Sequence, residues 1–454
     1  MSTLLVKNAY VLVTMDDGRR EITGGGLFAR DGVIESVGVM QELPGAADRV
    51  FDAAGMLVLP GLVNSHHHLY QSLTRAVPGA QDVPLFDWLR CLYPIWANLD
   101  PASVRVATTV GLLELVKSGC TTGFDHQYLW PNASRVDDQV EGARAVGIRF
   151  HASRGSMSLG EKDGGLPPDS MVQDHDTILE DTARVIDAFH DPRTGSMLQI
   201  AVAPCSPFTV TEELMRDSAA LAREKGVRLH THIAETKDEE RFTLDRFGKR
   251  PVEYAASLDW LGEDVWLAHA VFVDSDEITR MAETGTGVAH CPSSNMRLAS
   301  GIAPIAGYLA SRVPVGLGLD GSASNDSGNL LAETRQAMLL GRLSVSPGIG
   351  QGPQMSARTA LEMATRGGAE VLGRNDIGAL EPGRMADFFT LDLGRVEFSG
   401  ALHDPVAAAL MCAPVPARHV YVGGEPVVED CHHRSIDEGR LVEQHNRLAA
   451  ELMR

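Results

Sequence analysis

Residues 60–68 read Pro60-Gly61-Leu62-Val63-Asn64-Ser65-His66-His67-His68. The apolar run from Met56 to Val63 predicts a buried parallel strand. Side chains alternate along a strand, so His66 and His68 point to one side and His67 to the other. Because functional groups of a (β/α)₈ barrel sit at the C-terminal ends of its strands, this stretch predicts a barrel strand that presents half of a metal site.

Composition and charge describe an ordinary globular protein with an acidic surface. The 454 residues are 44% hydrophobic and 22% charged, which is ample material for a large core and an accessory domain. Lys and Arg total 40 against 60 for Asp and Glu, a formal net charge of -20. Such a protein is repelled by phosphate backbones and anionic lipids, so we expect no nucleic acid and no membrane partner.

Six cysteines are scattered along the chain without a CxxC pair: Cys91, Cys120, Cys205, Cys291, Cys412 and Cys431. This spacing indicates neither a disulfide framework nor a structural zinc cluster and is typical of reduced thiols. The first residues lack a basic region followed by an apolar segment, and no apolar stretch reaches membrane-spanning length. We therefore expect a cytoplasmic protein.

Strand and helix patterns alternate from residue 57 onward. The clearest helix follows Asp100, which can cap it: Pro101 suits the first position, apolar residues run from Val104 to Val116, and Gly119 ends it. Eight candidate strands lie near residues 57–64, 121–125, 148–152, 198–203, 227–232, 265–269, 287–290 and 315–319. Eight strands with intervening helices favour a (β/α)₈ barrel over an open sheet.

Both chain ends contain short strand patterns. Residues 4–13 and 26–39 hold β-branched segments and turn signals, which predict a small antiparallel sheet. Short strands return in residues 378–388 and 417–424. We expect the two ends, residues 1–56 and 375–454, to form one small β-sandwich domain with a terminal helix, while residues 57–374 form the barrel.

Three later strand ends carry further candidate site residues. Alternation places His230 and His232 on one side of their strand, with Glu235 just beyond it. We favour His232 as a metal ligand and Glu235 as a general acid/base. His269 can bind metal or hold a reacting water, and we favour the second role. Asp320 ends the last strand and offers both an anionic ligand and a proton acceptor.

The ligand set predicted for one metal ion is His66, His68, His232 and Asp320. Three imidazoles and a carboxylate leave room for a water molecule and suit zinc or iron(II) equally. Alone, a histidine triplet is more often a solvated loop, and an isolated Asp-Gly is usually a turn. Donors from the first, fifth, sixth and eighth strands converge on one barrel mouth, and this conjunction favours the metal site.

The remaining histidines receive no ligand role. We interpret His230 as a residue that supports a ligand or packs beside it. His290 is either a further site residue or a hydrogen-bonded histidine beneath a loop. No metal role is predicted for His126, His151, His432 or His433.

These motifs together resemble the amidohydrolase superfamily. The matching segments are the stretch at 60–68, His232-Ile233-Ala234-Glu235, His269, His290-Cys291-Pro292-Ser293-Ser294-Asn295, Leu319-Asp320-Gly321 and the tail at 360–387. The resemblance implies a barrel with a small β-domain, one zinc on His66, His68, His232 and Asp320, and catalytic Glu235, His269 and Asp320. The fourth strand ends Ala203-Pro204-Cys205-Ser206 without the lysine that bridges two metals in some members, which favours the one-metal deaminase and chlorohydrolase branch.

Within that branch, residues 66–75 with 85–89 and 92–96 resemble the deaminases of 8-oxoguanine. That resemblance implies attack of a zinc-activated water at C2 of the purine, with Glu235 as proton donor, to give urate and ammonia. The same-class alternative is another ring, such as a hydroxyatrazine-type triazine, isoxanthopterin or guanine. The different-class alternative is a non-catalytic protein built on this fold. A homo-oligomer is consistent with the superfamily.

Gln71 is the first candidate for substrate binding. It follows a predicted ligand by three residues, and its amide can both donate to and accept from a lactam edge. The alternative is an ordinary surface residue of a helix. Four aromatic residues are interpreted as packing and are not assigned to the site: Trp88, Trp96, Tyr128 and Trp130.

Overall fold

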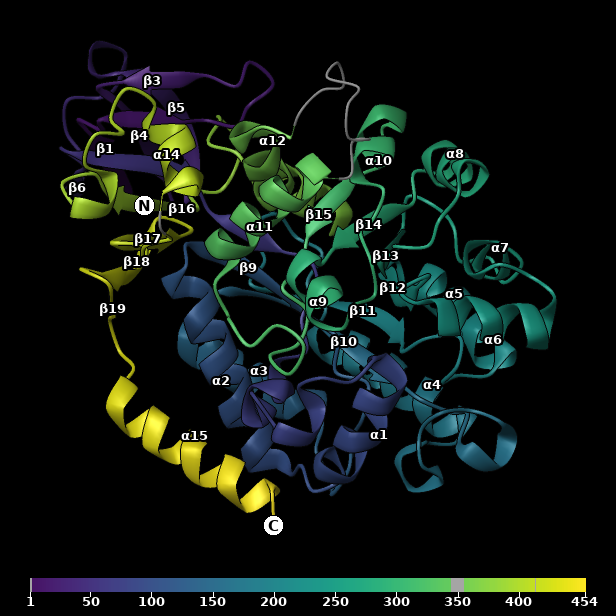
Figure 1. The fold of residues 1–454 in the computed structure, drawn as a ribbon. Helices are drawn as coiled ribbons and strands as arrows, with labels where there is room; N and C mark the ends of the chain where they lie inside the picture. Colours follow the sequence, from purple (N-terminus) through teal and green to yellow (C-terminus); the bar gives the residue numbers. More distant parts are fainter. Residues whose placement is uncertain (1, 344–354, 413) are drawn as a thin grey trace.

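The computed structural model describes residues 2–343, 355–412 and 414–454. Its centre is a closed barrel of parallel strands in the order β8 to β15 (Figure 1). The strands are β8 (Leu62–Asn64), β9 (Cys120–Asp125), β10 (Arg149–Ser156), β11 (Leu198–Pro204), β12 (Arg228–Ile233), β13 (Val265–His269), β14 (Gly287–His290) and β15 (Val315–Leu317). The predicted eight-stranded (β/α)₈ barrel is confirmed.

Helices connect the strands and cover the outside of the barrel (Figure 1). The longer ones are α1 (Leu85–Trp96), α2 (Pro101–Lys117), α3 (Val136–Val146), α4 (His175–Phe189), α5 (Glu212–Lys225), α6 (Lys237–Phe247), α8 (Ser275–Thr284) and α11 (Leu330–Leu343). The shorter ones are α7 (Pro251–Ala256), α9 (Pro292–Arg297), α10 (Ile305–Ser311), α12 (Ala357–Glu362), α13 (Gly368–Val371) and α14 (Pro405–Met411). In the part of the chain that the structure describes, none is long and apolar enough to cross a bilayer.

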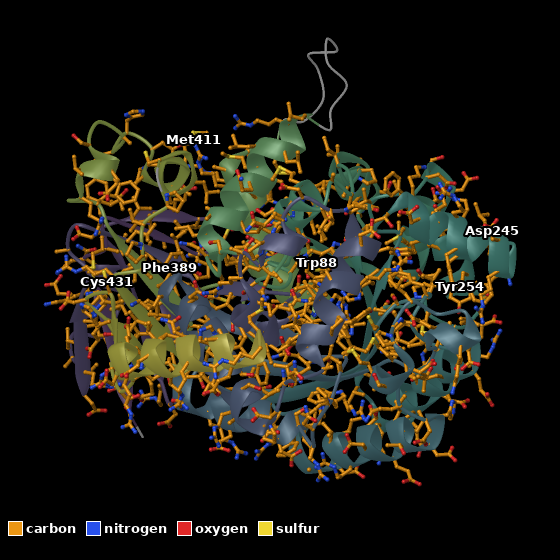
Figure 2. The ribbon with its side chains drawn as sticks, turned by 60° about the horizontal axis from the view of Figure 1, so that its bottom comes forward. Trp88, Asp245, Tyr254, Phe389, Met411 and Cys431 are labelled. Carbon is orange, nitrogen blue, oxygen red and sulfur yellow. The ribbon has the colours of Figure 1, made fainter. Side chains whose placement is uncertain are left out.

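The predicted boundaries of α2 are confirmed by its caps. Asp100 accepts a hydrogen bond from the backbone N–H of Ser103, and the Ser103 side chain accepts one from Asp100 in return. At the other end, Gly119 adopts a φ of 96°. A Cβ there would lie 2.6 Å from the ring of Phe389, which belongs to the small domain (Figure 2). Glycine is therefore needed both for the turn and for the close approach.

The predicted first strand, residues 57–64, is wrong in one respect, because the structure divides it at Gly61. The first part, β7 (Met56–Pro60), pairs with β16 (Phe388–Asp392) outside the barrel, and only β8 joins the barrel. Gly61 donates its N–H to the carbonyl of Asp387, whereas Leu62 donates to the carbonyl of Gly119. A single apolar run therefore serves two sheets, which a hydrophobic pattern does not distinguish.

The small β-domain contains two sheets. One has the order β5 (Val33–Val39), β4 (Gly25–Arg30), β1 (Thr3–Lys7), β6 (Arg49–Asp52). The other has the order β19 (His432–His433), β18 (Glu425–Glu429), β17 (His419–Val422), β16, β7, β2 (Val11–Val13), β3 (Glu21–Thr23). This sheet therefore combines strands from the N-terminal and the C-terminal parts of the chain. The predicted antiparallel pairing is found between β1 and β4 and between β4 and β5, whereas β1 also pairs with β6, and β2 with β7, in parallel.

Buried ion pairs lie between the small domain and the N-terminal ends of the barrel strands. Arg149, the first residue of β10, contacts Asp387 with Nε at 2.6 Å from Oδ2, and both side chains are almost fully buried. Arg374 pairs with Asp376 at 2.7 Å nearby. These pairs fix the small domain to the bottom of the barrel. The division of the chain at residues 57 and 374 stays a prediction.

Candidate metal centre and substrate pocket

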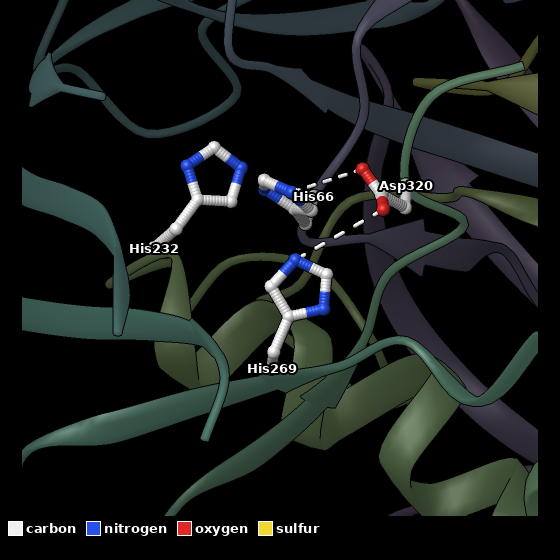
Figure 3. A group of neighbouring side chains, drawn as sticks. All are labelled: His66, His232, His269 and Asp320. Atoms are coloured by element: carbon white, nitrogen blue, oxygen red, sulfur yellow. Dashed lines mark ion pairs between the residues drawn. The ribbon is translucent and has the colours of Figure 1, made fainter. Parts of the chain in front are cut away.

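Four of the predicted site residues, His66, His232, His269 and Asp320, lie close together at the C-terminal ends of the barrel strands (Figure 3). Asp320 Oδ1 lies 3.4 Å from His66 Nε2 and 3.2 Å from His68 Nε2. Asp320 Oδ2 lies 3.9 Å from His269 Nε2, and the Nε2 atoms of His68 and His232 are 3.1 Å apart. One ligand atom each from His66, His232, His269 and Asp320 all lie within 4.8 Å of one another. The residues that were selected because they follow or end barrel strands are therefore close to one another in the structure.

The imidazoles of His68 and His232 point their unprotonated Nε2 atoms toward each other. His68 Nδ1 lies 2.5 Å from the carbonyl oxygen of His126, and His232 Nδ1 lies 2.6 Å from the carbonyl oxygen of Cys205. Since a carbonyl only accepts, each Nδ1 carries the proton and each Nε2 is left as an acceptor. Burial lowers the pKa of His232 to about 3, so its ring is neutral. Two acceptors 3.1 Å apart fit a cation between them.

The third imidazole has a similar arrangement through His230. His230 Nδ1 donates to the carbonyl of Trp266 at 2.9 Å, so its Nε2 accepts from His66 Nδ1 at 2.8 Å. His66 Nε2 is then a buried acceptor without a hydrogen-bond partner. This geometry agrees with the supporting role expected of His230. Three unprotonated Nε2 atoms and one carboxylate within a few ångströms fit zinc or iron(II).

Asp320 is held by hydrogen bonds on both oxygens. Ser294 and Ser324 donate their hydroxyls to Oδ2 at 2.5 and 3.0 Å, and the N–H of Gly321 donates to Oδ1 at 2.7 Å. These three donated hydrogen bonds favour the charged form of the carboxylate and offset the cost of burying it. Asp320 therefore stays an anion at the mouth of the barrel.

Glu235 differs from Asp320 in that few groups contact its carboxyl. It is buried, with His269 Nε2 at 3.6 Å from Oε2 and the Ser300 hydroxyl at 3.4 Å from Oε1. Burial and then the charge of Asp320 raise the pKa of Glu235 to about 8. At neutral pH this carboxyl holds a proton that it can donate.

The backbone at this end of the barrel is strained. Ala234, His269 and Asp320 each follow or end a strand with a positive φ, at 57°, 70° and 63°. Such conformations cost about 1–3 kcal/mol each and are retained where neighbouring groups enforce them. At the first of the three, the buried carboxylate of Glu239 accepts the N–H groups of Ala234 and Glu235 at 2.7 and 2.8 Å. Glu239 thereby fixes the direction of the Glu235 side chain.

A pocket opens beside these groups. Gln71 lines it, and its Oε1 lies 3.4 Å from the backbone N–H of Ala323. A Cβ at Gly321 would come within 1.9 Å of that oxygen, so glycine is required for the amide to sit there. The other lining residues are His68, Leu85, Trp88, Leu89, Tyr128, Cys205, Ser206, Phe208, His232, Glu235, His269, Leu298 and Asp320.

Sequence reasoning missed part of the pocket wall. Trp88 and Tyr128, which their spacing in the sequence assigns to packing, both line the pocket. The other two aromatic residues do not line it. Trp96 Nε1 donates a hydrogen bond to the Thr74 hydroxyl, and Trp130 Nε1 donates one to the carbonyl of Gly155. Cys205 and Ser206 follow the fourth strand directly, so the strand-end rule was a signal for them. Phe208 and Leu298 lie in turns, for which the sequence carries no such signal.

Two further histidines lie close to the site. His126 Nε2 lies 2.8 Å from the carbonyl oxygen of Ala203, while its Nδ1 is buried without a partner. One ring nitrogen of His126 is within 4.8 Å of ligand atoms of His68 and His232. His290 is buried at the end of β14 but belongs to none of the candidate metal groups in the described part of the chain.

The amidohydrolase family matches residues 57–427. This chain belongs to that family. It is 49% identical over 432 residues to an 8-oxoguanine deaminase of Pseudomonas aeruginosa, covering 94% of this chain and 95% of that protein. It is 40% identical to a hydroxydechloroatrazine ethylaminohydrolase of Pseudomonas sp., covering 89% and 86% of the two chains.

A solved structure gives the same result for the fold. The atrazine chlorohydrolase TrzN of Arthrobacter aurescens, in complex with zinc, superimposes with a TM-score of 0.93 at 35% identity, covering 98% of this chain and 100% of that one. The predicted family and fold are confirmed. The predicted enzyme class, a hydrolase of carbon–nitrogen bonds in cyclic amidines, is also confirmed, because the relatives are deaminases and hydrolases.

Proposed function

We propose that this chain is a zinc-dependent hydrolytic deaminase whose substrate is 8-oxoguanine. The observation that carries the chemistry is the buried Glu235 carboxyl, 3.6 Å from His269 Nε2, at a cluster formed by Asp320 and the imidazoles of His66, His232 and His269. The choice of ring is supported by 49% identity to an 8-oxoguanine deaminase over nearly the whole of both chains.

His66, His68, His232 and Asp320 would hold the zinc, which supplies Lewis-acid activation of the attacking water. The zinc-complexed relative supports this choice of metal. The chain's own groups then divide the proton transfers. Asp320 Oδ2 can accept a proton from the water, and His269, whose Nε2 is 3.9 Å away, can orient that water by a hydrogen bond.

Glu235 acts on the ring. Its proton goes to the ring nitrogen next to C2, which relieves the negative charge that develops as C2 becomes tetrahedral. A C2–O bond forms and the exocyclic C2–N bond breaks, and protons passed back through Glu235 leave with the amine as ammonia. Water and 8-oxoguanine thus give urate and ammonia, with no oxidant or reductant required.

The pocket suits a flat, polar heterocycle. Trp88 and Phe208 provide aromatic surface, Leu298 an apolar contact, and Gln71 a buried amide in the pocket wall. An amide can pair with a lactam edge by donating from Nε2 and accepting at Oε1. We assign Gln71 to substrate binding on this basis.

The proposed function is tested by measuring ammonia release and loss of substrate absorbance with four rings in parallel: 8-oxoguanine, guanine, isoxanthopterin and hydroxyatrazine. We expect the highest kcat/KM for 8-oxoguanine, and its loss in Glu235→Gln. Preference for another of these rings would overturn the substrate but keep the deaminase chemistry. No activity of the zinc-loaded protein on any of the four would overturn both.

A matched control separates chemistry from folding. Glu443→Ala changes an exposed carboxylate on the terminal helix. It should leave both the zinc content and the kcat of the enzyme unchanged, whereas Glu235→Gln should keep the zinc content and lose the kcat.

A further inference from the structure

The C-terminal helix reaches the substrate-binding side of the barrel. Helix α15 (Glu438–Leu452) leaves the small domain after β19 and lies along α2 (Figure 1). Its first turn is fixed by an ion pair of 2.6 Å between Glu438 and Lys117. Its last turn is buried against the apolar cluster that contains Tyr70 and Trp96, through Leu452. The helix therefore packs across the segment that begins directly after the histidine triplet.

That segment, Leu69–Thr74, is a six-residue 3₁₀ helix in which every residue is buried. Runs of 3₁₀ helix longer than three or four residues are uncommon, because their hydrogen bonds have poor geometry. Such a segment needs support from its surroundings. At its start, the Asp125 carboxylate accepts the N–H of Leu69 at 2.6 Å, and at its end Trp96 Nε1 donates to the Thr74 hydroxyl at 3.1 Å.

The middle of the 3₁₀ segment is supported by the terminal helix. His445 is buried, and its Nε2 lies 3.1 Å from the hydroxyl of Ser72. Ser72 also lies 3.4 Å from the carbonyl of Ala107 on α2, so its hydroxyl can donate to one of these groups while it contacts the other. Burial lowers the pKa of His445 to about 4, so the ring is neutral and can accept at Nε2.

Ser72 is the neighbour of Gln71 in the chain. The Gln71 carbonyl accepts the Thr74 hydroxyl at 3.1 Å, and the Gln71 side chain lines the pocket. Any rotation of this 3₁₀ turn moves the amide relative to the pocket, because the two residues share a peptide unit.

We propose that His445, through its hydrogen bond to Ser72, is a positioning residue for Gln71, so that the C-terminal helix takes part in substrate binding. The inference rests on the proposed function, since it gives Gln71 a role in holding the ring. His445 itself does not line the pocket. Its loss should weaken substrate binding and leave the proton-transfer groups in place.

The experiment measures kcat and KM of the zinc-loaded enzyme for 8-oxoguanine in His445→Leu and His445→Gln. We expect KM to rise about tenfold in His445→Leu with kcat within about twofold, since one buried hydrogen bond is lost. The Gln side chain carries an amide nitrogen and oxygen near the position of Nε2, so His445→Gln should recover most of the affinity. Asn446→Ala, at an exposed neighbouring position on the helix, is the matched control.

A double-mutant cycle tests whether His445 acts through Gln71. In a Gln71→Ala background, His445→Leu should change KM by less than about twofold, because the amide that it positions is gone. Equal effects of His445→Leu with and without Gln71 would overturn the proposal, as would an unchanged KM in the single variant. If His445→Leu does not fold, Ser72→Ala removes the same hydrogen bond from the other side and decides the question in the same way.

This outcome is distinguishable from failure of the proposed function. Wild-type enzyme that does not deaminate 8-oxoguanine would overturn the function. Active wild-type enzyme whose KM is insensitive to His445 and Ser72 would overturn only the positioning role.

Discussion

The two ends of the barrel bury charged and titratable groups in different ways. At the N-terminal end, Arg149 makes two hydrogen bonds to Asp387, and Asp387 also accepts the N–H of Gly423. At the C-terminal end, His66 Nε2 has no partner, and His68 and His232 face each other as acceptors. Buried polar groups that are paired within the chain stabilise one structure, whereas those left unpaired depend on a ligand.

The backbone conformation also differs between the two ends of the barrel. None of Arg149, Arg374, Asp376 and Asp387 has a positive φ, whereas His269 and Asp320 do. Strain and unpaired donors or acceptors coincide at the mouth, and both are absent from these residues at the bottom. The comparison predicts that substitutions at the mouth change activity more than stability, and that substitutions at the bottom do the reverse.

The largest effect is expected for Glu235→Gln. The amide keeps the shape of the side chain but cannot donate a carboxyl proton to the ring, so kcat should fall by about 10²–10⁴-fold. The midpoint of urea unfolding should stay near that of the wild type, because a neutral acid is replaced by a neutral amide. Steady-state kinetics and a urea titration of the same preparation measure both. A large loss of stability would contradict the assignment of Glu235 to the mouth's functional groups.

The next effect concerns the bottom of the barrel. Asp387→Asn leaves the buried Arg149 guanidinium without its carboxylate, which should lower the free energy of unfolding by about 3–5 kcal/mol. The kcat of the folded protein should stay within about twofold. The double variant Arg149→Met with Asp387→Leu should recover part of the stability, since no charge remains buried. Equal stability of the single and double variants would argue against this account.

Removal of zinc is expected to lower the stability of the protein only through the loss of its binding to the predicted ligands at the C-terminal mouth of the barrel. Zinc at about 1,000 times its Kd stabilises a protein that binds it only when folded by about 4 kcal/mol. A chelator should therefore lower the Tm, and added zinc should restore it. His232→Gln should abolish this zinc-dependent shift, whereas Asp387→Asn should keep it. A zinc response that survives in His232→Gln would show that the metal is held elsewhere.

The smallest expected effect is the pH dependence of activity. The raised pKa of Glu235, about 8, means that its protonated form predominates below that pH and is lost above it. Because the protonated form donates, kcat/KM should fall about tenfold per pH unit above about 8. The residual activity of Glu235→Gln should lack this decrease. A decrease of the same size in that variant would assign the titration to another group.

Much of the site could be predicted from the sequence, because the signals that mark its residues lie within a few positions of each of them. Alternation along a strand and the rule that functional groups sit at strand ends selected His66, His68, His232 and Asp320. The structure places Asp320 beside His66 and His68, and His68 beside His232. The helix from Pro101 was predictable for the same reason, since its caps lie within a few residues of its ends.

The parts that sequence reasoning missed depend on contacts between distant segments. The division at Gly61 is made by hydrogen bonds to Asp387 and Gly119, which no periodicity records. Phe208 and Leu298 enter the pocket from connecting segments whose course is set by packing. The pairing of His445 with Ser72 joins residues 373 positions apart. Such features follow from the assembled fold and not from any window of sequence.

The pairing of β7 with β16 has a consequence for how the protein is made. Leu59 lies opposite Phe389, so the partner of β7 is synthesised about 330 residues later. At about 5–20 residues per second, the N-terminal strand waits on the order of 15–60 s for its neighbour. Throughout that time its apolar edge is open to other chains. The order of synthesis therefore makes the small domain the last part of the molecule to close.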